Sequence, residues 1–147
     1  SDPERGTPPE AILRVAGRLG LRAELREGLS VDDLVEALRR GVPPIVDLQA
    51  WTNADVESDG FRWADAWEDG HYVVLIGIEG ETLIFEDPSL LGARGYIPRA
   101  EFLERWRDYE GEPPYRPSDP GDRAYVRAAI FIEGAKAADA PALTKID

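Results

Sequence analysis

The sequence predicts an α+β fold in which helices pack against a small antiparallel sheet. Residues 7–20 and 30–41 carry the apolar spacing and the end signals of helices. Residues 70–88 hold two apolar, β-branched runs around a Glu-Gly pair, which is typical of a β-hairpin. No internal repeat or change of composition divides the 147 residues. We therefore expect one domain over residues 1–134 and a loose tail over residues 135–147.

The expected helices are defined by the residues at their ends. Thr7 caps the first helix, two prolines lie in its first turn, and Gly20 follows its last turn. Ser30 caps the second helix, with Asp33 in the first turn. A third helix is expected over Arg99–Tyr109, because its large apolar residues recur on one face.

The remaining apolar runs are short and are expected to be strands. They lie at residues 21–25, 45–51, 94–98 and 125–132, in addition to the hairpin. The run at 45–51 is the expected central strand. Between it and the hairpin, residues 52–69 form a polar, Trp-bearing segment that predicts a loop with one helical turn. Loops of this length without regular structure are more often functional than passive.

Composition excludes several classes of partner and cofactor. The net charge of −12 argues against binding to nucleic acid or to anionic membranes. No apolar run is long enough to span a bilayer and no signal peptide is present, so we expect a cytoplasmic protein. With no cysteine and one histidine, thiolate and zinc sites are excluded, and no metal or nucleotide cofactor is expected. The chain begins at Ser1 and contains no Met, so we expect that an N-terminal segment has been removed or lies on another chain.

Residues 55–60 resemble the opening of a calcium-binding loop. Acidic residues alternate there and Gly60 takes the sixth position, but the twelfth position is Ala66 instead of the glutamate that such loops need. A solvated acidic loop is therefore the favoured interpretation.

His71 and Asp87 lie at the two outer ends of the hairpin, and the hairpin register decides whether they meet. A loop of residues 78–80 places them directly opposite each other, and a loop of residues 79–81 makes them diagonal neighbours on one face. Cross-strand spacings of about 4.5–8 Å then permit a hydrogen bond. A two-residue loop puts them on opposite faces, so the contact requires an odd loop or a bulge.

An imidazole held by a carboxylate is the base and its orienting group in a nucleophilic triad. The hypothesis for His71 and Asp87 is therefore proton transfer from a thiol or hydroxyl. The alternative is a histidine that caps or snorkels at the end of a strand. Ser89 is close to His71 in the diagonal register, but it lacks the Gly-x-Ser-x-Gly context of a serine nucleophile.

Three further residues are candidates for substrate binding. Gln49 ends the expected central strand beside Trp51, where it can line a cleft, although a side chain satisfied by the backbone is the alternative. Trp51 and Trp67 can wall a binding groove, but aromatic residues that close a small core fit equally well.

Several short motifs, in the order in which they follow one another along the chain, resemble the C39-like family of papain-like cysteine peptidases. They are Gly-His-Tyr at residues 70–72, Asp-Pro-Ser at residues 87–89, and Glu-Phe-Leu at residues 101–103 followed by Trp106. Among the members of that family are the peptidase domains that remove double-glycine leaders from bacteriocin precursors. The resemblance extends over about residues 7–134, and its most specific part is Gly-His-Tyr followed by Asp-Pro at hairpin spacing.

The resemblance implies a papain-like fold and amide hydrolysis through a thioester, with His71 as general base and Asp87 as its orienting group. It also implies a cysteine at the start of an early helix and a glutamine shortly before it that stabilises the oxyanion. Neither has a counterpart here, so we expect both to precede Ser1. Gln49 lies on a different element and is not assigned that role.

Three interpretations follow for the function. The chain is part of a peptidase whose cysteine lies on a missing or separate N-terminal fragment, or a non-catalytic relative that binds an extended peptide, or a domain with an unrelated role. The expected partners are a peptide or protein substrate and, in the first case, that fragment. A sheet face left open by a missing helix would also favour homo-oligomers.

Overall fold

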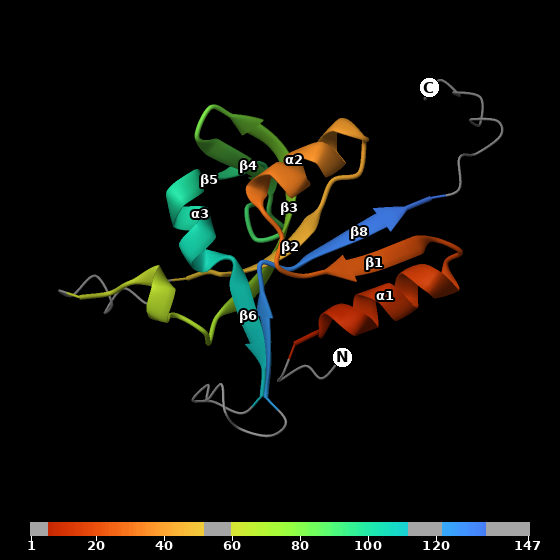
Figure 1. Cartoon of the computed structure of the whole chain (residues 1–147), viewed down its shortest axis with the longest axis horizontal. Coiled ribbons are helices and arrows are strands. Elements are labelled where there is room, and N and C mark those ends of the chain that lie inside the picture. The colour runs from red at the N-terminus through yellow and green to blue at the C-terminus, as the bar shows by residue number, and fades with distance from the viewer. Residues whose placement is uncertain (1–5, 52–59, 112–121, 135–147) are drawn as a thin grey trace.

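The computed structural model describes residues 6–51, 60–111 and 122–134 (Figure 1). Its helices and strands follow one another along the chain as α1 (Pro9–Arg18), β1 (Arg22–Arg26), α2 (Val31–Arg39), β2 (Ile45–Gln49), the short 3-10 helix η2 (Trp63–Asp65), β3 (Gly70–Glu79), β4 (Thr82–Glu86), β5 (Gly95–Pro98), α3 (Arg99–Arg105), β6 (Arg107–Glu110), β7 (Arg123–Val126) and β8 (Ala129–Glu133). Within this part of the chain, the helices are too short and too polar for any of them to cross a lipid bilayer.

The predicted α+β class is confirmed, and the sheet is larger than the small sheet that we expected. Six strands pair in the order β1-β8-β2-β3-β4-β5, with antiparallel neighbours throughout, while β6 and β7 form a separate two-stranded ribbon. In Figure 1 this ribbon extends below the sheet, near the start of α1. Strands β2 and β3 are the two central strands: β2, which was expected to be central, pairs with β8 and β3, and β3 pairs with β2 and β4.

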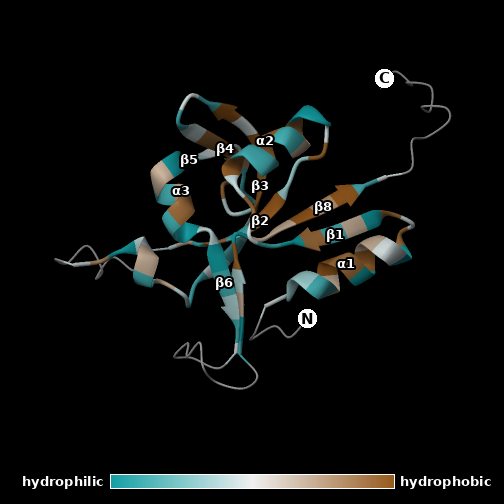
Figure 2. Cartoon of the chain, in the orientation of Figure 1, coloured by the Kyte–Doolittle hydropathy of each residue, from teal (hydrophilic) through white to brown (hydrophobic). Residues whose placement is uncertain are grey.

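The core lies on one face of the sheet, beneath α2 and α3. Alternate residues of the strands point there, as the period-two geometry of a strand requires, and they meet the apolar faces of the two helices. Phe102 lies between Phe85 and Trp106, with ring centroids 5.7 and 4.8 Å away. Helix α1 packs instead on β1 and β8. Figure 2 shows hydrophobic colouring on α1 and on β8, with β1 drawn between them.

The two helix starts illustrate one confirmed prediction and one error. Ser30 caps α2: its Oγ accepts from the Asp33 amide, and the Asp33 carboxylate accepts from the Ser30 amide. Thr7 does not cap α1, since Pro8 occupies the N-cap position without a side-chain hydrogen bond. The Thr7 carbonyl instead accepts a 2.9 Å hydrogen bond from the Tyr72 hydroxyl, which ties the start of the chain to β3.

The third helix and the last strand were each predicted too long. Helix α3 ends at Arg105, because Trp106 turns out of the helix into the core and its indole donates a hydrogen bond to the Ala128 carbonyl. The residues that follow pair as β6. The expected strand at 125–132 is two strands, β7 and β8, that meet at Arg127, whose φ of 50° no extended strand accommodates.

Three predictions fall partly or wholly outside the described residues, and one of them is the acidic segment at 55–60, of which only Gly60 is described. The tail at 135–147 lies outside them entirely. The loop at 52–69 is described only from residue 60 onward, where η2 supplies the single helical turn that was predicted.

Candidate functional site: a histidine–aspartate pair beside an acidic cavity

A two-residue turn and a bulge together set the register of the hairpin. Glu79 opposes Thr82, so the loop holds only Gly80 and Glu81, and Gly80 adopts a φ of 58°. A register shift between Leu75 and Gly77 then adds one residue to β3. The outer part of the hairpin therefore has the register that a three-residue loop would give. This bulge is what puts His71 and Asp87 on the same face as diagonal neighbours.

The structure brings His71 and Asp87 into contact. His71 Nε2 lies 2.7 Å from Asp87 Oδ1, and the two side chains are only 11% and 18% exposed. A carboxylate can only accept at neutral pH, so Nε2 carries the proton in the neutral ring and the lone pair is on Nδ1. Nδ1 is thus the nitrogen through which this ring can act as a base.

Ser89 holds the carboxylate in place. Its amide and its hydroxyl both donate to Asp87 Oδ1, at 2.8 and 2.6 Å. Partial burial would raise the pKa of Asp87, but these two hydrogen bonds and the one from His71 outweigh it and hold the pKa below its usual range. The role of Ser89 is therefore to position the Asp87 carboxylate. In the sequence, the signal for this role is a serine two residues after the aspartate.

Trp51 covers the imidazole. The centroids of the two rings lie 4.5 Å apart with a tilt of 49°. Trp51 has a φ of 50°, a strained conformation for a residue of this size, and the residue remains 56% exposed. A hollow of about 220 Å³ opens beside these rings, with Asp87 and Tyr96 on its wall.

The structure does not place Gln49 on the wall of a cleft. Its side chain is fully buried, its Nε2 donates to the carbonyl of Arg107 and to Asp108 Oδ1, and its Oε1 accepts from the amide of Asp69. These bonds tie β2 to β6 and to the start of β3. This geometry corresponds to the alternative from the sequence analysis, in which the hydrogen bonds of the Gln49 side chain are made largely to the backbone.

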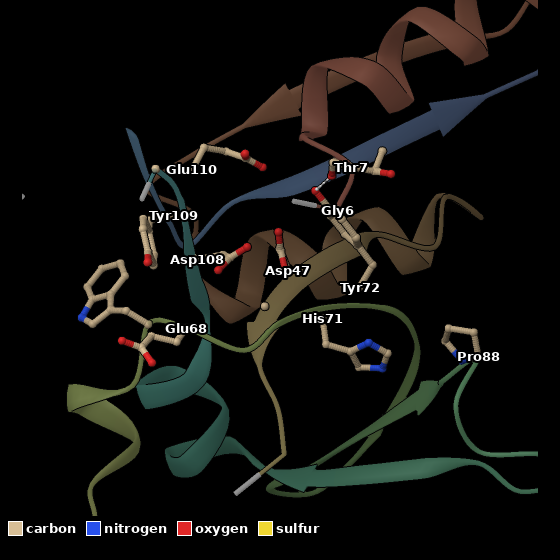
Figure 3. A pocket seen from close by; sticks show the side chains of 13 residues that line it. Gly6, Thr7, Asp47, Glu68, His71, Tyr72, Pro88, Asp108, Tyr109 and Glu110 are labelled. Atoms are coloured by element: carbon tan, nitrogen blue, oxygen red, sulfur yellow. Dashed lines mark hydrogen bonds between the residues drawn. The ribbon is translucent and has the colours of Figure 1, made fainter. Parts of the chain in front are cut away.

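A cavity of about 710 Å³ lies on the other side of β3 (Figure 3). It extends from Gly6 and Thr7, just before α1, to β6, and His71 lies at its edge. Trp67 lies on its wall, with the Arg107 guanidinium 4.7 Å from the centroid of its ring. The lining residues are Gly6, Thr7, Asp47, Trp67, Glu68, Gly70, His71, Tyr72, Pro88, Asp108, Tyr109, Glu110 and Gly111.

Two carboxyl groups that the sequence analysis missed lie side by side in this cavity. Asp47 projects from β2 and Asp108 from β6, and Figure 3 shows them adjacent. Burial, and next the charge of Asp108, raise the pKa of Asp47 to about 8. Burial likewise raises the pKa of Asp108. The signal available in the sequence was a single aspartate inside the apolar strand Ile45–Gln49.

Two neighbouring groups, Tyr72 and Glu110, also have raised pKa values. Burial raises the pKa of the Tyr72 hydroxyl, and the nearby Asp47 carboxylate raises it further. Burial and Asp108 raise the pKa of Glu110 in the same way. Among residues 6–51, 60–111 and 122–134, no group of three or more His, Asp or Glu side chains is arranged to hold a metal ion.

Comparison with known proteins identifies the family of the chain. The model of the Peptidase_C39 like family matches residues 20–113, which include His71, Asp87 and both cavity aspartates. The curated proteins contain no match to the chain. Since the family match spans more than half of the sequence, this chain belongs to the Peptidase_C39 like family.

Proposed function

We propose that this chain provides the general base and its orienting carboxylate for a cysteine peptidase, and that the nucleophilic thiol comes from a segment outside the chain. The observation that carries the proposal is the 2.7 Å contact between His71 Nε2 and Asp87 Oδ1. Membership of a peptidase family supports it. With no cysteine among its 147 residues, the chain is expected to be inactive alone.

In the proposed reaction, His71 Nδ1 takes the proton of the thiol as sulfur attacks the amide carbonyl. The imidazolium then protonates the departing amine, and a thioester remains. Water attacks the thioester while His71 again accepts a proton, and the acid product leaves with the thiol restored. Asp87 keeps the ring in the required tautomer and stabilises its charged form. Trp51 shields this hydrogen bond from water and borders the substrate, with Trp67 further along the groove.

A second function is peptide binding without catalysis. The absence of cysteine from the chain favours it. In that case the hollow beside Trp51 and the cavity beside His71 hold an extended peptide, and the His71–Asp87 pair fixes the shape of the groove. This alternative predicts peptide binding that no thiol reagent affects.

The test is hydrolysis of a peptide library by a longer form of the protein that carries a cysteine segment together with this chain. We expect hydrolysis that iodoacetamide abolishes, and a loss of about 10²–10⁴-fold in kcat/KM for His71→Ala, the usual contribution of a general base. Glu81→Gln, a change at the hairpin turn, is the matched control and should retain activity. Full activity in His71→Ala would end the proposal, and peptide binding without any hydrolysis would favour the second function.

A further inference from the structure

We propose that the cavity beside His71 binds the positively charged side chain of a lysine or arginine in a peptide, and that Asp47 and Asp108 hold its charge. The inference rests on the proposed function in one respect: it takes the ligand to be the peptide on which His71 acts. It adds a preference for basic residues that the family match does not supply.

The charge of the cavity wall is the first observation. Four carboxylic acids line it, from β2, from β6 and from the segment before β3: Asp47, Glu68, Asp108 and Glu110. No lysine or arginine is among the described lining residues, and His71 at the edge is the only basic group there. A concave wall of one sign concentrates ligands of the opposite sign.

The second observation is an unsatisfied oxygen. Asp47 is only 6% exposed, and its Oδ1 has no hydrogen-bond partner in the described part of the chain. A buried polar atom without a partner costs about 1–3 kcal/mol, so native proteins rarely leave one unless it has a role. An ammonium or guanidinium group in the cavity would donate the missing hydrogen bond and take the place of the proton that burial and the neighbouring Asp108 otherwise favour on Asp47.

The shape and the walls of the cavity suit an organic cation. A volume of about 710 Å³ exceeds what one basic side chain fills, and it leaves room for the adjoining peptide backbone. Tyr72 and Tyr109 are on the wall, and aromatic rings attract cations. The acids of the described chain are not arranged as a metal site, so the charge of an organic group is the better match.

The position of the cavity connects it to the reaction site. Asp47 lies directly opposite Tyr72 in the β2–β3 pairing, and Tyr72 is the residue after His71. Figure 3 shows His71 on the other side of β3 from Asp47, at the edge of the cavity. A peptide whose basic residue is seated against Asp47 would pass this edge of the cavity to bring one of its peptide bonds to the imidazole.

The experiment compares two blocked tripeptides, acetyl-Ala-Lys-Ala-amide and acetyl-Ala-norleucine-Ala-amide, by NMR titration of this chain at pH 7. We expect the lysine peptide to bind about tenfold more tightly, a modest value for a partly buried charge pair. Asp47→Asn, and independently Asp108→Asn, should reduce the difference to about twofold or less. Glu81→Gln makes the same acid-to-amide change outside the cavity and should leave the difference intact. A thermal melt shows whether each variant is folded.

Equal binding of the two peptides, or no measurable binding of either, would overturn the inference. So would a lysine preference that survives both aspartate variants. The proposed function fails separately: in the cysteine-bearing form, His71→Ala should stop hydrolysis of both peptides, whereas Asp47→Asn should remove only the preference for lysine. A lysine preference without hydrolysis supports the cavity assignment and contradicts the peptidase proposal.

Discussion

The carboxyl group of Asp47 is buried where the sheet meets β6. This burial should change how the free energy of unfolding depends on pH. Its pKa lies above the usual value because burial, then Asp108, disfavours its charge; Tyr72 and Glu110 also face it. The folded protein therefore holds a proton there between about pH 4 and pH 8 that the unfolded chain releases. The folded state then binds more protons, so this group lowers the free energy of unfolding as pH rises through that range.

Asp47→Asn should remove this loss of stability. Urea unfolding at several pH values should show that the free energy of unfolding of the variant increases relative to that of the parent protein from pH 5 to pH 8. The increase should be at most about 1.4 kcal/mol per pH unit, the limit for one proton. The linkage of Asp87 has the opposite sign: its lowered pKa contributes stability that is present above about pH 4 and is lost as pH falls through the folded pKa. A difference between variant and parent that stays constant from pH 5 to pH 8 would contradict the account of Asp47.

At the scale of elements, the close approach of β6 to β3 depends on one glycine. A Cβ atom at Gly70 would overlap the Asp108 carboxylate, which Gln49 holds with a 3.0 Å hydrogen bond. Gly70→Ala should displace that carboxylate, destabilise the fold by about 1–3 kcal/mol, and reduce the preference for the lysine peptide.

Gly77→Ala is the matched control in the same strand, because a Cβ there meets no atom within 4 Å. Urea unfolding and the peptide titration measure both effects. If the two glycine variants behave alike, then the contact between Gly70 and Asp108 has no role in the cavity.

The same elements show what the sequence could predict. The capping box of α2 and the hairpin strands depend on residues within a few positions of one another, so their patterns were sufficient. The end of α3 was not predictable in this way, because Trp106 leaves the helix to donate to the Ala128 carbonyl, 22 residues further along the chain. The break at Arg127 likewise separates β7, in the two-stranded ribbon, from β8, in the six-stranded sheet, and only the tertiary fold distinguishes the two.

In the candidate site, too, contacts between residues close in the sequence could be predicted, whereas contacts between distant residues could not. His71 and Asp87 could be paired from hairpin spacing, since either an odd loop or a bulge gives the required register, and the structure uses the bulge. Asp47 and Asp108 are 61 positions apart, and nothing local to either indicates that β6 will fold back beside β2. Gln49 lies with Asp108 in that contact, so its burial was equally hidden.

For the whole molecule, the arrangement of faces explains how one strand serves two sites. Residues of β3 that point to α2 and α3 build the core and end at His71, whereas Tyr72 points the other way, toward Asp47. The net charge of −12 surrounds both sites with a negative field. That field favours the approach of basic peptides, and added salt should weaken it.

The state of the single imidazole tests the central claim most directly, because the chain has one histidine and its ring signals belong to one residue. Nitrogen-15 NMR of this chain should show that the neutral form of the His71 ring carries its proton on Nε2. Asp87 should protect that proton from exchange, and Asp87→Ala should remove the protection. A ring protonated on Nδ1, or an Nε2 proton that exchanges as fast in the parent protein as in Asp87→Ala, would contradict the account.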